Sequence, residues 1–274
     1  MRTQIFFNHP NLNDLSYSSF TVVQERVVIT GGNDFADETQ QVNGHGVYLI
    51  DLPKYSVQKK LKNYQQLQLT INKGANLIHP RVRHSSTSDG VRYVYVVGSQ
   101  YTKANDKFEI YDTIKDQWRE GPSLIKGGKN LSCCYFKSGQ KEESIWVYTT
   151  GKMQRLALNG DYQVWTEIEI NGGKLLQDSS RQAMAQISIN QIIIFGGENN
   201  INYKDIDEVF YYNVEDSILQ SGPKLPDKIL PENPGYNLNS FASFYFLGNI
   251  GQIFKFNKYE RSWQRLPFET GSVF

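Results

Sequence analysis

The sequence has few cysteines, which excludes a disulfide-stabilised scaffold. Only Cys133 and Cys134 occur among the 274 residues, and they are adjacent. Neighbouring side chains of a strand point to opposite faces, so this pair offers neither a disulfide framework nor the C-x-x-C spacing of a metal site. We expect two buried thiols in a reducing compartment.

Long apolar runs and an excess of one charge are also missing. No apolar run approaches the roughly 18 residues that span a bilayer, and the start MRTQIFFNHPNLND has too short an apolar segment for a secretory signal. The 29 basic and 28 acidic residues leave a net charge of +1, without the basic surplus of proteins that bind nucleic acid or anionic membranes. The sequence predicts a soluble cytoplasmic protein that neither enters a membrane nor binds nucleic acid.

What the sequence does contain is a repeat. Five times, an apolar-rich segment ends at Asp or Asn, and a bulky apolar residue follows six positions later. Because Asp and Asn side chains hydrogen-bond the backbone of turns, each copy predicts a β-hairpin. The turn residues are Asp51, Asp112, Asn159, Asn213 and Asn257, and the bulky residues are Val57, Trp118, Trp165, Leu219 and Trp263.

Upstream of each hairpin lies another short apolar strand that ends in glycine or a substitute. Gly31, Gly98, Thr150, Gly196 and Gly248 fill the first position, and only Gly32 and Gly197 complete a pair. A further short segment precedes each of these strands, so every unit has four short antiparallel strands. The units measure 44 to 61 residues between turn residues, which matches one blade of a propeller.

The glycine pair in QIIIFGGENN admits a second interpretation, as a loop that holds a phosphate. Such a loop needs a helix after the glycines, whereas a polar loop and another strand follow here. We therefore interpret Gly196 and Gly197 as a strand end that adopts positive φ and approaches a neighbouring backbone closely.

These residues resemble the kelch repeat, which has an apolar strand, Gly-Gly, a variable loop, Tyr-Asp and, six residues later, Trp. The nearest copies are VYVVGS with FEIYDTIKDQWREGPSL, and IIIFGG with VFYYNVEDSILQSGPKLP. The resemblance covers roughly residues 16–268, although Val57 and Leu219 replace the expected Trp and three glycine pairs are incomplete. The alternative of WD40 repeats lacks the Trp-Asp dipeptide.

The resemblance implies an all-β fold: a β-propeller of four-stranded antiparallel blades with five complete kelch-like repeats. We expect one domain, 1–274, whose three hairpin tryptophans pack between blades. Residues 1–14 contain TQIFFNHP, which is similar to GQIFKFNKY of the fifth unit. Residues 2–8 are therefore expected either to close the ring or to belong to a partial sixth blade. The expected blades are approximately residues 15–63, 80–124, 128–172, 180–225 and 236–268.

Motifs that carry chemistry are scarce. No Gly-x-Ser-x-Gly elbow or G-x-G-x-x-G loop occurs, and IKGGKN, with Gly127 and Gly128, lacks the spacing of a phosphate loop. Two acidic clusters lack the alternation of a Ca²⁺ loop, and the histidines lie in separate segments without metal-ligand spacing. We expect no cofactor and no metal. The residues considered are Asp34, Asp37, Glu38, Asp205, Asp207, Glu208, His9, His45, His79 and His84, the last of which is expected to line the central channel.

One face of such a propeller would carry the variable loops, because connections in a four-stranded meander alternate between faces. These loops are residues 33–45, 99–107 and 198–207. The resemblance implies a platform that binds another protein, since recognition residues concentrate on loops held by a rigid scaffold. The alternatives are that Arg83 and Arg181 pair with carbonyls or carboxylates between blades, and that the propeller is an enzyme acting on a sugar or using a metal. The expected partner contacts are Arg83, Lys129 and Arg181 around the channel mouth, with Tyr101 and Tyr203 on the loops.

Overall fold

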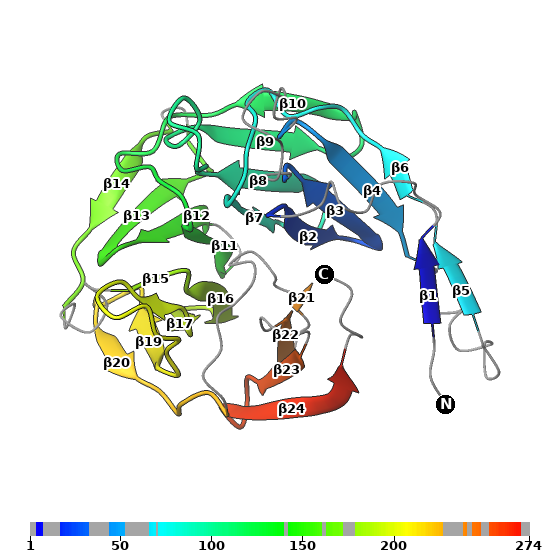
Figure 1. Ribbon diagram of the computed structural model, residues 1–274. Coiled ribbons are helices and arrows are strands. Elements are labelled where there is room, and N and C mark those ends of the chain that lie inside the picture. Colours follow the sequence, from blue (N-terminus) through cyan, green and yellow to red (C-terminus); the bar gives the residue numbers. More distant parts are fainter. Residues whose placement is uncertain are drawn as a thin grey trace.

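The protein is an all-β molecule whose short strands form blades around a common centre, as the computed structural model shows (Figure 1). Within the described residues, five four-stranded antiparallel sheets follow one another along the chain. The prediction of a β-propeller with four-stranded antiparallel blades is confirmed. The structure describes residues 4–7, 17–32, 44–52, 66–69, 71–139, 142–160, 163–171, 179–226, 238–239, 243–247 and 252–269.

Each blade runs from an inner to an outer strand, in the order of the chain. Blade 1 consists of β2 (Ser19–Val23), β3 (Arg26–Thr30), β4 (Val47–Asp51) and β6 (Ile71–Lys73). Blade 2 consists of β7 (Ser85–Ser88), β8 (Tyr93–Val97), β9 (Phe108–Asp112) and β10 (Gln117–Glu120). Blade 3 consists of β11 (Ser132–Ser138), β12 (Glu142–Thr149), β13 (Lys152–Ala157) and β14 (Trp165–Ile168).

The remaining blades follow the same plan. Blade 4 also carries a small separate sheet, which β15 (Ser179–Ser180) and β18 (Glu198–Asn199) form as an antiparallel pair. Blade 4 proper consists of β16 (Ala183–Ser188), β17 (Gln191–Phe195), β19 (Val209–Asn213) and β20 (Leu219–Ser221). Blade 5 consists of β21 (Leu238–Asn239), β22 (Ser243–Leu247), β23 (Gln252–Asn257) and β24 (Ser262–Glu269).

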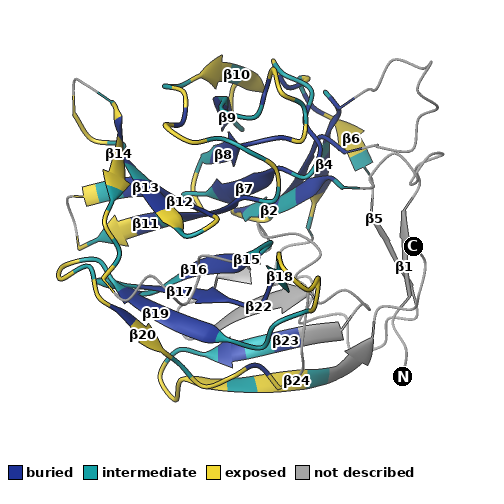
Figure 2. Ribbon diagram, turned by 60° about the vertical axis from the view of Figure 1, so that its left-hand side comes forward, coloured by how far each residue is buried: buried dark blue, intermediate teal, exposed yellow. Residues whose placement is uncertain are grey.

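The middle strands of blades 2, 3 and 4 are apolar on both faces because each of these blades packs against a neighbour on either side. In β8, Val94 and Val96 join the core between blades 1 and 2, whereas Tyr95 and Val97 join the core between blades 2 and 3. Figure 2 shows the same gradient across the blades, from buried inner strands to outer strands such as β10 and β14 with exposed residues. The hydrophobic core is therefore divided into seams between blades.

The adjacent cysteines follow this division. Cys133 packs in the seam between blades 2 and 3, and Cys134 packs in the seam between blades 3 and 4. Both are buried and neither forms a disulfide. Burial raises the pKa of the Cys133 thiol to about 12, so the thiol stays protonated at neutral pH. The expected pair of buried thiols on opposite strand faces is confirmed.

The hairpins between the third and fourth strands show the predicted turn chemistry. Asp112 ends β9, and its Oδ1 accepts hydrogen bonds from the backbone N–H groups of Ile114 and Lys115. Asn213 and Asn257 bond their turns in the same way. The residue before each of these turn residues faces the bulky residue across the hairpin: Tyr111 opposite Trp118, Tyr212 opposite Leu219, and Phe256 opposite Trp263.

Two details of the repeat differ from the expectation. In blade 3 the strand ends at Ala157, and Leu156 pairs with Trp165, so Asn159 lies in a longer turn rather than at the strand end. In blade 1 the partner of Ile50 is Ile71, which occupies the position expected for Val57. Val57 itself lies outside the described residues. The fixed spacing failed here because the chain inserts a segment that contains β5 (Gln66–Leu69) before the fourth strand.

The hairpin tryptophans pack between blades, as predicted. Trp118 packs against the core between blades 1 and 2, and its Nε1 donates to the carbonyl oxygen of Ala75 at 2.8 Å. Trp165 packs in the seam between blades 2 and 3, and its Nε1 donates to the Pro122 carbonyl oxygen at 2.8 Å. Trp263 packs between blades 4 and 5. In blades 2 and 3, the tryptophan of the outer strand thus hydrogen-bonds the segment that leads into the same blade.

The strand-ending glycines adopt the positive φ that was expected. Gly31 and Gly32 have φ of 60° and 99°, and Gly196 and Gly197 have φ of 64° and 101°. A Cβ on Gly197 would stand 2.5 Å from the carbonyl oxygen of Ser180, so a side chain does not fit there. Gly98 has φ of 74°. Gly248 lies outside the described residues.

The N-terminal strand lies elsewhere than expected. The strand β1 (Gln4–Phe7) pairs in parallel with β5, beside blade 1, and forms a separate two-stranded sheet (Figure 1). The sequence did not indicate β5 as the partner of this strand, because no repeat pattern marks residues 66–69.

Candidate functional site

Four residues in matching positions open the inner strands of blades 1 to 4. They are Tyr17, Arg83, Asn130 and Arg181, each two positions before the strand begins. All four have left-handed backbones, with φ of 56°, 52°, 57° and 61°. Non-glycine residues adopt this conformation at a cost of about 1 kcal/mol or more and concentrate at functional sites. We call these four residues the inner arc.

Hydrogen bonds connect the inner arc from blade to blade. The Arg83 N–H donates to the Tyr17 carbonyl oxygen at 3.1 Å, and the Asn130 N–H donates to the Arg83 carbonyl oxygen at 2.9 Å. The Ser132 hydroxyl, next along, donates to the carbonyl oxygen of Gln182, beside Arg181. The arc is therefore one continuous row along the inner edge of the ring.

Arg83 is the member of the arc that has spare hydrogen-bonding capacity. Its guanidinium carbon lies 4.3 Å from the centre of the Tyr17 ring, a cation–π contact that holds the side chain in place. Its Nε is buried and has no hydrogen-bond partner within the described part of the chain. Burying an unpaired polar atom is unfavourable, so Arg83 is the arc residue whose hydrogen-bonding capacity the described contacts leave partly unused.

Arg181 is held by a carboxylate. Its Nη1 lies 3.3 Å from Oε2 of Glu198, and both side chains are about one-quarter exposed at 24% and 21%. The alternative in which the arginines pair with protein carboxylates thus describes Arg181, although the partner belongs to the same blade. An incoming anion would have to compete with Glu198 for this guanidinium.

Lys129 does not occupy the position that the sequence suggested. Asn130 is the residue equivalent to Arg83 and Arg181, and Lys129 is an exposed neighbour. The basic side chain alone suggested Lys129, whereas the position two residues before β11 and the left-handed backbone belong to Asn130. Gly127 and Gly128 lie between β10 and β11, in the link from blade 2 to blade 3, where Gly128 donates its N–H to the Asn105 carbonyl oxygen.

The loop with Tyr101 lies against the arc. The Gln100 N–H donates to the Val82 carbonyl oxygen at 2.9 Å, directly before Arg83. The Tyr101 N–H donates to the Ser99 hydroxyl at 3.1 Å, and the ring is half-buried. The loop of residues 99–107 is therefore docked onto the same face as Arg83.

Tyr203 stands at the tip of an ordered hairpin that begins with β18. The Asn199 side chain accepts N–H groups from Ile201 and Asn202, and Asn199 and Lys204 are also joined by their backbones. This turn presents Ile201 and Tyr203 to solvent, with 72% and 77% of each residue exposed. Sequence reasoning missed Ile201. Its signal is an isolated apolar residue in the polar segment ENNINYKD.

A buried ion pair that the sequence did not reveal supports these loops. The Arg81 guanidinium donates to Oε1 of Glu109 at 2.7 and 2.9 Å, and both side chains are fully buried. Its Nη1 also donates to the carbonyl oxygens of Gly98 and Lys107, which flank the 99–107 loop. Arg81 therefore fixes both ends of the loop that carries Tyr101.

His84 does not line the central channel. It is fully buried, and its Nε2 lies 2.9 Å from the Thr30 hydroxyl of blade 1. His45 and His79 are also engaged, by the Leu77 carbonyl oxygen and by Glu120. In the described residues, no three or more His, Cys, Asp or Glu side chains gather in a way that could hold a metal ion. Of the acidic clusters, Asp207 pairs with Lys224, and residues 34, 37 and 38 lie outside the described residues.

Comparison with known proteins finds similarity in fold and not in sequence family. No protein-family model matches the sequence, and no curated protein matches it. Solved structures with a similar fold are numerous, at 612 chains, so the fold alone does not indicate one activity. The chain is a β-propeller. No helix in the described part of this propeller is long and apolar enough to cross a membrane.

One of these structures is a fungal alcohol oxidase of the AA5 family, in complex with copper. It is similar to this propeller with a TM-score of 0.57 and 14% sequence identity. The match covers 93% of this chain and 54% of the oxidase chain, so the propeller spans about half the length of that protein. At this identity the similarity concerns the fold.

Proposed function

We propose that this protein is a non-catalytic interaction scaffold of the kelch type, which binds another protein through the face that carries the inner arc. The observation that carries this proposal is the arc itself. Four non-glycine residues with left-handed backbones stand in a hydrogen-bonded row, and the buried Nε of Arg83 has no partner within the described residues. Rigid positions of this kind favour recognition, because little conformational entropy is lost on binding.

The loops around the arc support the same function. The hairpin tip offers Ile201 and Tyr203 as exposed apolar contacts, and the Tyr101 loop lies beside Arg83. Tyrosine and arginine are enriched among the residues that dominate binding energy at protein interfaces. We therefore assign Arg83, Arg181, Tyr101 and Tyr203 as partner contacts, with Lys129 as an exposed neighbour on the rim.

The test reverses the charge at the arc. The double variant Arg83→Glu/Arg181→Glu should abolish capture of the partner, because a carboxylate replaces each guanidinium. One non-glycine residue replaces another at both positions, so the cost of the left-handed backbone is similar in variant and wild type. Affinity capture followed by mass spectrometry, with wild type and variant compared under equal loading, measures the effect.

The matched control is Arg119→Glu, an exposed arginine on the outer strand β10. It makes the same substitution at one position, half the charge change of the double variant, but lies away from the arc, so capture should persist. Thermal unfolding of all three proteins shows whether each is folded. Undiminished capture by a folded double variant would contradict the proposal.

An enzyme that acts on a sugar or uses a metal is the alternative function. The AA5 alcohol oxidase shares the fold at 14% sequence identity, which is the observation that favours this alternative. Metal analysis of the purified protein separates the two functions, since a stoichiometric metal would favour the enzyme.

We also propose a location in the cytoplasm, on the basis of the composition.

A further inference from the structure

A cavity lies between blades 3 and 4, away from the inner arc. Its volume is about 180 Å³, enough for one amino-acid side chain. It is lined by residues next to the β11–β12 and β19–β20 connections. Connections alternate between the faces of a propeller, so this cavity opens on the face opposite to the proposed protein-binding face.

Aromatic rings from both blades form the inner wall of the cavity. The ring centres of Trp146 and Phe136 are 6.1 Å apart, and those of Trp146 and Tyr212 are 5.7 Å apart. All three side chains are almost fully buried. Trp146 and Phe136 come from blade 3, whereas Tyr212 comes from blade 4, so the wall exists only where the blades meet.

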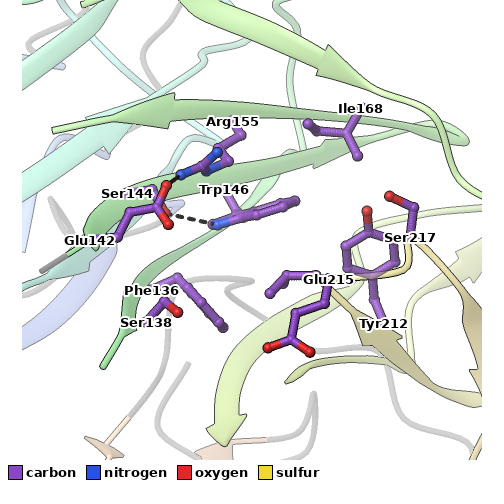
Figure 3. Close-up of a pocket in the computed structure, with 11 residues that line it drawn as sticks. Phe136, Ser138, Glu142, Ser144, Trp146, Arg155, Ile168, Tyr212, Glu215 and Ser217 are labelled. Carbon is purple, nitrogen blue, oxygen red and sulfur yellow. Dashed lines mark hydrogen bonds and ion pairs between the residues drawn. The ribbon is translucent and has the colours of Figure 1, made fainter. Parts of the chain in front are cut away.

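The charged lining carries an excess of negative charge. Glu142, Glu215 and Arg155 line the cavity, which gives two carboxylates against one guanidinium. Arg155 forms an ion pair with Glu142, and its guanidinium carbon lies 5.7 Å from the centre of the Trp146 ring. In Figure 3, Arg155 lies above the Trp146 ring and Glu215 lies below it. The charge of the exposed Glu142 is therefore paired with a side chain of the protein itself.

Glu215 is the charge that the protein leaves unneutralised. Its carboxylate forms no ion pair and no hydrogen bond within the described residues, and Tyr212, Trp146 and Phe136 border the same cavity. The Trp146 Nε1 donates to the Ser144 hydroxyl at 3.0 Å, whereas the buried Arg155 Nε and Tyr212 hydroxyl have no hydrogen-bond partner within the described residues.

The turn that carries Glu215 is rigid. The Glu215 N–H donates to Oδ1 of Asn213 at 3.0 Å, and the Asn213 amide donates to Asp216 at 3.1 Å. The Val214 N–H donates to the Asn190 carbonyl oxygen at 2.9 Å, which ties this turn to the neighbouring hairpin of blade 4. The backbone that carries Glu215 is therefore fixed at the cavity rim, and its exposed carboxylate can reach a ligand from there.

From these contacts we propose that the cavity binds an organic cation, a primary alkylammonium or a guanidinium. The cation is held by the Glu215 carboxylate and by the faces of the aromatic wall. Aromatic faces attract cations electrostatically, and this attraction is larger where water is excluded. The shared chemistry fits either a Lys or Arg side chain of a protein or a free organic amine.

The experiment follows the indole N–H resonance of Trp146 by NMR, assigned with the variant Trp146→Phe. Four probes are titrated at constant ionic strength: Nα-acetyl-lysine methylamide, Nα-acetyl-arginine methylamide, n-butylammonium chloride and the neutral Nα-acetyl-norleucine methylamide. We expect a saturable shift with at least one cation and none with the norleucine probe, which matches lysine in its chain but lacks the charge.

The decisive variant is Glu215→Gln, which keeps the size of the side chain and removes its charge. It should weaken cation binding at least about tenfold, the effect of losing one charged hydrogen-bonding partner. The matched control is Glu260→Gln, an exposed glutamate in the equivalent turn of blade 5, which should leave binding unchanged.

Three results would overturn the proposal: no saturable shift with any cation, an equal shift with the norleucine probe, or unchanged binding by Glu215→Gln. If the proposal holds, the source of the cation follows from the ranking of the probes. Tighter binding of the capped lysine or arginine than of n-butylammonium indicates a protein side chain, and the reverse ranking indicates a free amine. Partner capture by the inner arc is measured separately, so failure at one face leaves the other unaffected.

Discussion

At the scale of single residues, His84 shows how burial between blades controls protonation. The ring is fully buried, its Nε2 contacts the Thr30 hydroxyl, and Arg81 lies nearby with its positive charge. Burial, and to a lesser extent Arg81, lower the pKa of His84 to about 3. The folded protein therefore keeps this histidine neutral where the unfolded chain, with a pKa near 6.5, binds a proton.

His84 should make the folded state sensitive to mild acid. Since the folded pKa is depressed, its stabilising contribution is complete above pH 6.5 and is lost as the pH falls from about 6.5 towards 3. The free energy of unfolding should decline by up to about 1 kcal/mol for each pH unit in that range because of this residue. Urea denaturation of wild type and His84→Gln between pH 7 and pH 4 measures the slope.

The variant should have a shallower slope than wild type, whatever its stability at neutral pH. The control is His79→Gln, a partly exposed histidine that pairs with Glu120. It should retain the slope of the wild type. Equal slopes for His84→Gln and the wild type would show that His84 does not govern the acid response.

At the scale of strands, the outer strand of one blade holds the chain that leads into that blade. In blades 2 and 3 the connection is made by an indole N–H, from Trp118 to Ala75 and from Trp165 to Pro122. The two contacts have the same sequence separation, so they are one structural device used twice. Each combines a neutral hydrogen bond with packing of a large ring in a seam.

Replacing these tryptophans by phenylalanine should destabilise the protein in proportion to burial. Trp118→Phe should cost about 1 kcal/mol, mainly for the lost hydrogen bond, and Trp165→Phe about 2 kcal/mol, because Trp165 is the more buried. Denaturant unfolding measures both. Ile114→Ala, at an exposed turn residue, should change little, and a tryptophan variant as stable as this control would contradict the role described here.

The sequence predicted those parts of the blades that depend on local chemistry. Asp112 and Asn213 could be recognised because a turn needs an Asx side chain near its start, and Gly197 because a side chain does not fit there. The partner of Ile50 could not be recognised, since an insertion changes a spacing without changing the pairing. At this scale, a constant spacing predicts a hairpin only where the turn has constant length.

The candidate sites were less predictable than the blades. Arg83 and Arg181 were found because a basic residue opens their strands, but the spare Nε of Arg83 depends on contacts with Tyr17 from another blade. The cavity with Glu215 and Trp146 is lined from two successive blades by residues that are about 70 positions apart in the sequence. No local sequence pattern predicts this cavity, because it forms only when the two blades pack together.

At the scale of the whole molecule, strand pairing and burial decrease from the middle strands of each blade to its outer strand. Strands β8, β12 and β17 each pair on both sides and are buried between two blades, whereas β10, β14 and β20 pair on one side only. Inner strands are further joined by hydroxyl groups, as in the 2.7 Å contact between Ser19 and Ser86. The seams and these contacts hold the blades together as neighbours around the centre.

Amide hydrogen exchange should therefore be slowest in β8, β12 and β17 and fastest in β10, β14 and β20. Peptide-resolved mass spectrometry under native conditions measures this ranking in one experiment. Peptides from the outer strands that exchanged as slowly as those from β8 would show that the blade edges are covered by something not seen in these contacts.

The adjacent cysteines have a practical consequence. Cys133 and Cys134 are next to each other in the chain, yet one thiol reports on the seam between blades 2 and 3 and the other on the seam between blades 3 and 4. Because both are buried and protonated, an alkylating reagent labels each only after its own seam opens. With either cysteine replaced by alanine, the alkylation rate of the remaining thiol measures how often one pair of blades separates, without any foreign probe.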